Sequence, residues 1–212
     1  KLAAALRRLG FDRVFDTVFG ADLTIMEEAT ELIGRMNSGE NMPMFTSCCP
    51  GWISYCEENH PELLDHISTC KSPQQMAGAM IKTYLAEKEG IDKDRIVVVS
   101  VMPCTAKKYE LTRADENAGG VPDVDFSITN RELGRMIERA DIPFIALEDE
   151  DFDLPLGIGT GAGTIFGATG GVMEAALRTA NDWVNGTPQK AIDYKEVRGI
   201  EGVKEAVYKV GK

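Results

Sequence analysis

The run of residues 96–101 most constrains the fold of this chain. All of its residues except Ser100 are β-branched and apolar. An uninterrupted run of this kind is typical of a strand that is covered on both faces, as in the parallel sheets of α/β proteins. Pro103 stops the strand, because proline cannot donate to a sheet ladder. We therefore expect an α/β fold with Cys104 at the carboxyl end of a buried strand, where open α/β sheets bind ligands.

Two adjacent cysteines, Cys48 and Cys49, follow a second short apolar run at residues 44–46. Neighbouring residues on an extended strand point to opposite faces. One thiol can then bind a metal while the other faces a different cavity. Pro50 and Gly51 turn the chain straight after the pair. The alternative is that both are small buried hydrophobic residues, a role that free cysteines often take.

A lysine follows the second of these cysteine sites. Lys107 comes three residues after Cys104, on the turn that leaves the expected strand. A thiolate that binds a metal needs nearby positive charge or N–H donors to stay deprotonated. Lys107 and the amides of the turn offer both.

Strand-like and helical patterns alternate along the chain, which predicts a mostly parallel sheet flanked by helices. Residues 11–18 and 126–129 are expected strands, and residues 203–210 a strand or hairpin arm. Residues 1–10, 72–87, 130–139 and 172–184 are expected helices, and Thr24 with Glu27 forms a capping box for one more, to about Met36. The acidic, proline-containing stretch 141–155 predicts a boundary between residues 1–140, which carry both cysteine motifs, and residues 141–212.

Composition narrows the partners and the compartment. A net charge of −11 argues against nucleic acid and anionic membranes as partners. No apolar stretch approaches membrane-spanning length, and no signal peptide is visible. The five cysteines lack the spacing of a disulfide framework, which indicates a reducing, cytoplasmic location.

Glycine is dense in residues 157–164, and a second glycine cluster follows Phe166. Glycines let backbone N–H groups approach a ligand closely, and the start of a helix favours negative charge. The spacing matches neither the dinucleotide-binding pattern nor the P-loop. A flexible loop with close helix packing is the alternative.

Glu28, Glu31 and Arg35 are spaced to lie on one face of the expected helix. A charged face of this kind is by itself typical of a solvated surface. His60 and His66 are spaced like no known metal motif, so we expect structural or surface histidines.

At residues 46–52 and 102–110 the sequence closely resembles the catalytic domain of iron-only hydrogenases. Residues 15–22 and 166–171 resemble it as well. That family carries three cysteine signatures, and the third, with two more cysteines, does not occur in this sequence. The resemblance implies two lobes of mostly parallel sheet flanked by helices, with the second lobe incomplete. Both ends look cut, so we expect a fragment of a longer domain.

The resemblance also implies a function, the reversible reduction of protons to dihydrogen. The cofactor is the H-cluster, a four-iron four-sulfur cluster bridged to a di-iron unit, and ferredoxin or another iron–sulfur carrier supplies electrons. Cys49 and Cys104 are then cluster ligands, and Cys48 is the thiol that exchanges the proton. A proton relay leads away from Cys48 through Glu28, Ser68, Glu31 and Arg35. The residues implied around the di-iron unit are Lys107, Met102, Pro103, Ser72, Gln74, Gly163 and Phe166.

The cysteine count bears on whether this chain acts alone. Such a cluster is held by four thiolates, and the matched motifs supply two. Cys56 and Cys70 lie outside the motifs and are expected to be buried thiols. We therefore expect the isolated chain to be inactive, with the cofactor absent or incomplete.

One alternative is a non-catalytic hydrogenase-like protein that serves in iron–sulfur cluster assembly. The resemblance implies that such relatives generally lack the proton-transferring thiol. This sequence retains Cys48, together with Glu28 and Glu31. Retention of these residues favours the enzyme.

Overall fold

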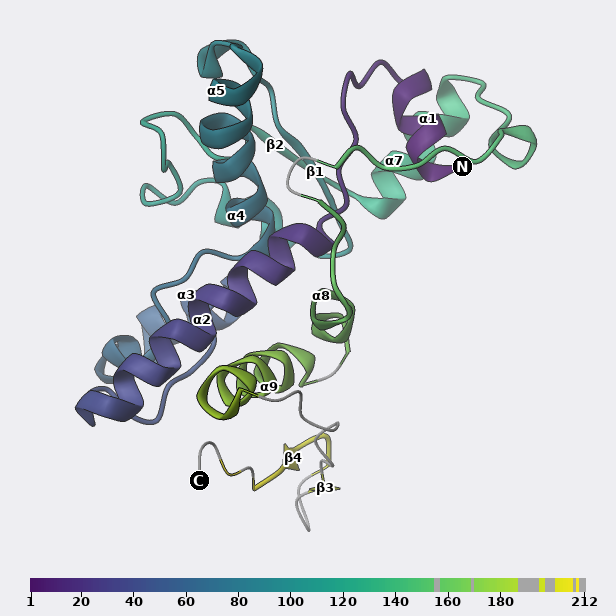
Figure 1. The fold of residues 1–212 in the computed structure, drawn as a ribbon. Coiled ribbons are helices and arrows are strands. Elements are labelled where there is room, and N and C mark those ends of the chain that lie inside the picture. Colours follow the sequence, from purple (N-terminus) through teal and green to yellow (C-terminus); the bar gives the residue numbers. More distant parts are fainter. Residues whose placement is uncertain (155–156, 169, 187–194, 197–200, 208, 210–212) are drawn as a thin grey trace.

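A computed structural model describes residues 1–154, 157–168, 170–186, 195–196, 201–207 and 209. Long helices dominate the molecule, and two short strands form its central sheet (Figure 1). In chain order the elements are α1 (Leu2–Arg8), α2 (Val18–Ser38), α3 (Pro50–Asn59), the 3-10 helix η1 (Pro61–His66), α4 (Pro73–Met80), the π-helical turn η2 (Ile81–Leu85), α5 (Ala86–Glu89), η3 (Lys93–Arg95), β1 (Val99–Met102), α6 (Ala106–Glu110), β2 (Phe126–Thr129), α7 (Asn130–Arg139), η4 (Phe144–Ala146), α8 (Gly161–Phe166), α9 (Gly171–Asn185), β3 (Lys195–Glu196) and β4 (Lys204–Glu205).

The central sheet confirms the predicted α/β class. Strands β1 and β2 pair in parallel, with Val99 opposite Phe126 and Met102 opposite Thr129. Strand β1 begins later than predicted, and it is half-buried rather than covered on both faces. Val97, at the start of the expected run, is 64% exposed. In the described residues β1 pairs with β2 alone. Residues 96–98 of the expected run precede β1 and are not part of the strand.

The first predicted strand is wrong. Residues 11–17 form no strand and one isolated bridge, between Phe15 and Asp153, and the backbone of Thr17 is already helical. Helix α2 begins at Val18, because the carboxylate of Asp16 accepts a hydrogen bond from the Val18 amide at 3.0 Å. Thr24 is therefore not a cap; it lies buried inside the helix, and its hydroxyl donates to the Lys71 carbonyl at 3.2 Å.

Other local predictions are confirmed. Helices α1 and α9 and the run from α4 through α5 lie where the sequence places them. Thr129 ends β2 and caps α7 in a full capping box: its hydroxyl accepts from the Glu132 amide at 3.2 Å, and its own amide donates to Glu132 at 2.7 Å. The predicted terminal strand shrinks to β4, and residues 208 and 210 lie outside the described residues.

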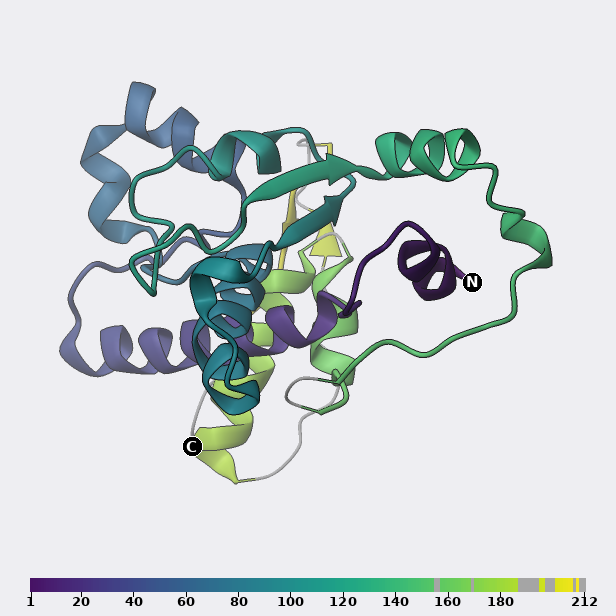
Figure 2. The ribbon, with the colours of Figure 1, turned by 90° about the horizontal axis from the view of Figure 1, so that it is seen from above.

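Helix α1 and helix α7 enclose the main apolar core. The side chains that α1 contributes to this core are mostly small. The buried members are Ala3, Ala4, Ala5, Leu6, Val14, Leu133, Ile137 and Leu147. After α7 the chain runs around α1 and returns to the start of α2 (Figure 2). Arg7 fastens this returning segment through ion pairs with Glu150 at 2.7 Å and Asp153 at 2.9 Å.

Helix α2 is the central support of the rest of the molecule. Helices α4, α8 and α9 all pack against it, which Figure 1 shows as layers above and below α2. Within residues 141–212, Glu150 and Asp153 are thus held by α1, and α8 and α9 lie against α2. The division into two lobes near residues 141–155 stays a prediction, and Pro155 lies outside the described residues.

The contact of α4 with the segment before β2 generates a stability prediction. A Cβ atom on Gly78 would lie 2.4 Å from the Asp123 carbonyl oxygen and 2.7 Å from Val124. We expect Gly78→Ala to lower the free energy of unfolding by about 1–3 kcal/mol through overpacking. Gly134 on α7 has open space around its Cβ position. Gly134→Ala is the control, with a gain of up to about 1 kcal/mol. Denaturant unfolding measures both, and a loss of equal size in both variants would contradict the packing argument.

Candidate functional site

The first cysteine pair lies on an extended segment that leads into α3. Phe45 forms a parallel bridge with Ile67: its amide donates to the His66 carbonyl at 2.8 Å, and its carbonyl accepts from Ser68 at 2.7 Å. The predicted short strand is thus a single bridge. Cys49 is the N-cap residue of α3, and Pro50 occupies the first helical position, where its missing N–H costs nothing.

The second motif places its cysteine one residue before the N-cap residue of α6, which is Thr105. Cys104 falls between the end of β1 and the start of α6. Lys107, in the first turn of α6, donates from Nζ to the Cys48 carbonyl at 2.8 Å. Arg113, three residues beyond the end of α6, pairs with Glu57 near the end of α3 at 2.8 Å. Helices α3 and α6 therefore run side by side in the same direction, and the two motifs meet at one end, where Cys49 and Cys104 are exposed.

Cys48 is half-buried between this end and helix α2. Burial, and after it the charge of Glu28, raise the pKa of its thiol to about 11. Lys107 acts in the opposite direction, because its positive charge favours the thiolate. The thiol of Cys48 therefore holds its proton at neutral pH.

Glu28 is fully buried on α2. Burial raises the pKa of its carboxyl group to about 7, although the Ser47 amide and the nearby Ser68 hydroxyl act to lower it. The Ser47 amide donates to Oε1 at 3.4 Å, and Oε2 has no hydrogen-bond partner. A carboxyl group in this state is half-protonated near neutral pH.

Glu31 lies one turn further along α2, and its surroundings are different. Burial acts to raise its pKa, but hydrogen bonds from Ser68 and Arg35 and the amide of Thr69 lower it below its ordinary value. The Ser68 hydroxyl donates to Oε2 at 2.8 Å. Glu31 therefore stays ionised where Glu28 does not.

Arg35 ends this series. It pairs with Glu31 at 2.6 Å and donates to the carbonyls of residues 41, 65, 66 and 67, among them Ile67 at 2.8 Å. The charged face of α2 is therefore covered by two other segments and is no solvated surface. The pattern alone predicts a solvated surface, and that prediction is wrong. The segments that cover the face are distant in sequence, so the local pattern could not reveal them.

Cys70 belongs to the same cluster, which the sequence gave no signal to predict. Its thiol donates to Glu31 Oε2 at 3.6 Å, and its carbonyl accepts from the Ser47 hydroxyl at 2.6 Å. Burial raises the pKa of the Cys70 thiol to about 12, and the charges of Glu28 and Glu31 act in the same direction. Cys56, by contrast, is a buried thiol as expected.

Glu110 is a second residue that the sequence did not single out. It is buried, and it accepts hydrogen bonds from Ser72 at 3.0 Å, Gln74 at 2.5 Å and Lys107 at 2.9 Å. Ser72 occupies the N-cap position of α4, but its hydroxyl makes no capping bond. Three of the residues implied around the di-iron unit thus meet at one carboxylate.

The glycine-rich stretch does not form an open loop at its centre. Residues from Gly161 onward form α8, and Gly163 donates its amide to the Asp22 carboxylate at 2.8 Å. A Cβ atom on Gly163 would lie 2.7 Å from the Val18 carbonyl oxygen. The close-packing interpretation therefore holds at this glycine, and its N–H is already occupied. Phe166, at the end of α8, is half-buried.

The remaining predicted residues lie apart from the carboxylate series. Met102 ends β1 and is half-buried, and Pro103 is exposed. His60 lies beside Glu62, and His66 contacts the Pro43 carbonyl. Within the described residues no three of His, Cys, Asp and Glu are grouped to hold a metal ion. That Cys49 and Cys104 are cluster ligands stays a prediction, and the matched motifs provide no other cysteine for that role.

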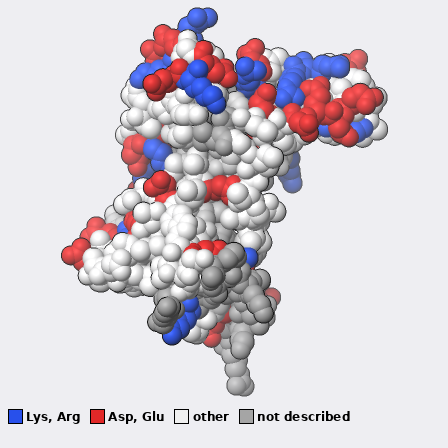
Figure 3. Space-filling view, in the orientation of Figure 1, with Lys and Arg blue, Asp and Glu red and all other residues white. Residues whose placement is uncertain are grey.

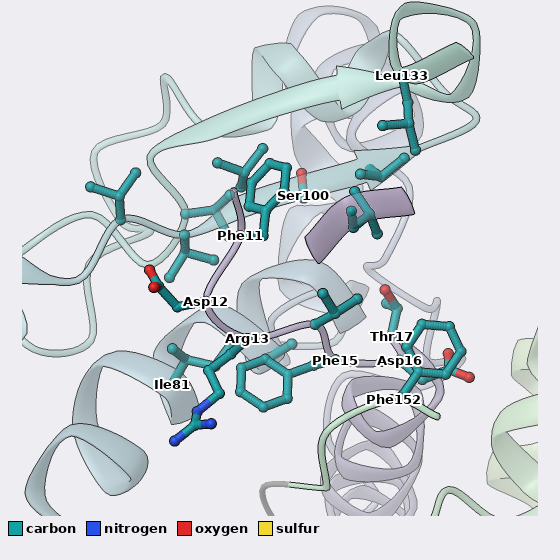
Figure 4. A pocket seen from close by; sticks show the side chains of 18 of the residues that line it. Phe11, Asp12, Arg13, Phe15, Asp16, Thr17, Ile81, Ser100, Leu133 and Phe152 are labelled. Carbon is teal, nitrogen blue, oxygen red and sulfur yellow. The ribbon is translucent and has the colours of Figure 1, made fainter. Parts of the chain in front are cut away.

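A large cavity lies elsewhere, between α1, α4, α7 and strand β1. It has a volume of about 1440 Å³ and mostly apolar walls, with Phe11, Phe15 and Phe152 around it (Figure 4). Gln74 and Met102 reach its wall, but none of the cysteines line it. The thiols are therefore not gathered in this cavity.

Charged groups on the face in Figure 3 gather over α5 and around α1 and α7, with both signs interspersed. The middle of this face is mostly uncharged. Among the described residues, no helix has the length and apolar character needed to cross a membrane.

The fold and the site define a class: an α/β domain in which two exposed thiols lie beside a third thiol and a series of buried carboxylates. Comparison with known proteins agrees. The family model described as the iron-only hydrogenase large subunit, C-terminal domain, matches residues 1–212. The chain belongs to this family.

Individual relatives support the assignment. The chain is 55% identical to the NADP-reducing hydrogenase subunit HndD of Solidesulfovibrio fructosivorans, over all of this chain and 37% of that protein. It is 53% identical to iron hydrogenase 1 of Clostridium pasteurianum, over 97% of this chain and 36% of that protein. An apo form of the FeFe-hydrogenase HydA1 of Chlamydomonas reinhardtii superposes with a TM-score of 0.84 at 51% identity, over 96% of this chain and 52% of that one. The chain thus spans between about a third and a half of the length of these relatives.

Cluster-assembly proteins are also related, at lower identity. The cytosolic iron-sulfur assembly component 3 of Rattus norvegicus is 34% identical over 93% of this chain and 44% of that protein. The alternative function therefore lies within the wider set of relatives, and the choice between the two functions rests on the site.

The buried carboxyl group of Glu28 generates a pH prediction. Between pH 4.5 and about 7 the folded chain holds a proton that the unfolded chain has lost, so Glu28 makes the free energy of unfolding fall as pH rises. We expect Glu28→Gln to be as stable as the wild type at pH 5 and more stable at pH 8, by up to about 3 kcal/mol. Denaturant unfolding at both pH values measures the difference.

Glu31→Gln is the control with the opposite sign. Its lowered pKa adds stability above the ordinary carboxyl pKa, which is lost as pH falls through the folded value. This variant should be less stable than the wild type at pH 8, with a smaller difference at pH 3. Equal effects of Glu28→Gln at pH 5 and pH 8 would show that Glu28 titrates normally.

Proposed function

We propose that the protein to which this chain belongs catalyses the reversible reduction of protons to dihydrogen, with electrons from ferredoxin or another iron–sulfur carrier. The observation that carries the proposal is the series Cys48, Glu28, Ser68, Glu31 and Arg35. It connects a thiol at the meeting point of both cysteine motifs to the far end of a covered helix face. A buried redox centre cannot exchange protons with water directly, and a series of this kind supplies the route.

The pKa values along this series suit proton transfer. Cys48 holds a proton at neutral pH because its pKa is about 11. Glu28, with a pKa of about 7, both accepts and releases a proton near neutral pH. The Oε2 atom of Glu28 has no hydrogen-bond partner and lies in the same cluster as Ser68. The Ser68 hydroxyl can accept a proton from one side while it donates its own to Glu31 on the other.

Glu31 and Arg35 form the outer part of the relay. Glu31 is ionised and therefore accepts a proton from Ser68 only transiently, which favours onward release. Arg35 holds the Glu31 carboxylate in place through two hydrogen bonds to Oε1, at 3.0 and 2.6 Å. The carbonyls around Arg35 fix the guanidinium in turn.

Cys49 and Cys104 would be two of the four thiolates that hold the four-iron four-sulfur cluster. The H-cluster, when bound, supplies the electron transfer and the site at which protons are reduced. Lys107, Ser72, Gln74, Met102, Pro103, Phe166 and Gly163 remain the proposed surroundings of its di-iron unit. The Gly163 amide would need to leave Asp22 to contribute a hydrogen bond there.

Location and partners complete the proposal. We propose a cytoplasmic protein that does not bind nucleic acid or membranes, in keeping with its net charge of −11. One relative, 50% identical, is named as the periplasmic iron hydrogenase large subunit of Nitratidesulfovibrio vulgaris, so membership of the family leaves the compartment open.

The relay is tested in a chimera, in which residues 1–212 replace the matching segment of iron hydrogenase 1 of Clostridium pasteurianum. We expect the chimera to evolve dihydrogen, and Cys48→Ser to lower turnover by about 100-fold or more while iron content is unchanged. Cys49→Ser should instead lower the iron content. Cys56 lies on α3, the helix that begins after Cys49, and outside the relay, so Cys56→Ala should retain turnover.

The same experiment separates the two candidate functions. A protein that only assembles or carries clusters should keep its function after Cys48→Ser, since the iron is held by other residues. Full turnover of the Cys48→Ser chimera would therefore remove the case for this relay.

For the chain on its own we expect no hydrogenase activity. Four thiolates are needed for the cluster, and the two motifs provide Cys49 and Cys104. Reconstitution of the purified chain with iron and sulfide, followed by iron analysis and a hydrogen-evolution assay, measures this. A full complement of iron together with evolved hydrogen would contradict the expectation.

A further inference from the structure

Glu110 is a buried carboxylate for which the relay has no use. Glu110 lies on α6 and is 3% exposed. The three side chains that donate to it come from the start of α4 and from α6 itself. A carboxylate buried to this degree costs free energy unless its lone pairs are occupied by donors.

The donors divide between the two oxygens of Glu110. Oε2 accepts from Ser72 at 3.0 Å and from Gln74 at 2.5 Å, while Oε1 accepts from the Lys107 ammonium at 2.9 Å. Gln74 also donates to the Lys107 carbonyl at 3.1 Å. Both partners of the Gln74 nitrogen are acceptors, which fixes the orientation of the amide. The carboxylate is therefore held in one position from several directions.

Lys107 connects this carboxylate to the first cysteine motif. Its ammonium lies between Glu110 Oε1 and the Cys48 carbonyl oxygen, at 2.9 and 2.8 Å. Its side chain is 13% exposed, and Glu110 supplies the negative charge in direct contact with it. A neutral carbonyl alone is a poor partner for a desolvated ammonium. Without the carboxylate, the flexible lysine side chain can carry its charge out to water.

The packing of α3 beside α6 has a separate attachment. Arg113, three residues beyond the end of α6, forms two hydrogen bonds with Glu57 near the end of α3, at 3.0 and 2.8 Å. Loss of the Glu110 carboxylate therefore leaves the two segments tied together. Its effect should be local to Lys107.

We propose that Glu110 is a positioning residue whose carboxylate holds the Lys107 ammonium against the Cys48 carbonyl, and so fixes Lys107 between the two cysteine motifs. The proposal rests on the proposed function for its significance, because Lys107 belongs to the proposed surroundings of the di-iron unit. Glu110 acts there through Lys107.

A chemical readout on the purified chain tests the proposal. It is the rate at which acetic anhydride modifies Lys107, measured by peptide mass spectrometry. We expect Glu110→Gln to increase this rate by about tenfold, because the released ammonium moves to water. A Lys107 that stays protected in Glu110→Gln would overturn the proposal.

A conservative variant distinguishes positioning by the charge from general packing. Glu110→Asp keeps the charge on a shorter side chain and should protect Lys107 better than Glu110→Gln does. Equal modification of Lys107 in Glu110→Asp and Glu110→Gln would count against a role for the charge.

A control variant guards against general loss of structure. Glu57→Gln removes the ion pair with Arg113 and should not change the rate at which Lys107 is modified. The readout needs neither iron nor turnover, so failure here is separate from failure of the Cys48→Ser chimera.

Discussion

The site depends on how the chain compensates the carboxylates that it buries. Glu31 and Glu110 each receive a cation and several hydrogen-bond donors, so both can be held inside the protein as ions. Glu28 receives one long hydrogen bond from a backbone amide and no cation. The protonated state of Glu28 has the lower free energy, because desolvation penalises a charge that nothing compensates. This difference makes Glu28, among these carboxylates, the one suited to exchange protons near neutral pH.

Cys48 lies between two of these groups. Glu28 faces it from α2 and disfavours the thiolate, while Lys107 faces it from α6 and favours it. The thiol is therefore affected by charges on two helices, α2 and α6, that are far apart in sequence. Folding brings both charges to the thiol. Burial is the largest influence on the pKa of this thiol, and the two charges act beside it in opposite directions.

Local sequence signals predicted local structure well. The Thr129 capping box, the proline at the start of α3 and the helix of residues 72–87 depend on neighbouring residues, and all appear in the structure. The start of α2 was mispredicted because Asp16 caps the helix from outside the periodic pattern. For the glycine-rich stretch the sequence left two interpretations open, and at Gly163 the structure shows close packing of α8 on α2, which no local signal reports. Glu110 and Cys70 were missed, since nothing near them in the sequence marks them as buried partners.

What the sequence determined by itself was the family and the identity of the reacting groups, because motifs with fixed residues at fixed spacing leave few alternatives. The tertiary structure decided what each group can do. Glu28 and Glu31 are the same residue type on one helix face, yet the pKa of the first is raised to about 7 and that of the second is lowered. The reason is physical: the pKa of a carboxyl group follows from burial and from the donors around it, and those donors come from segments that only folding brings to α2.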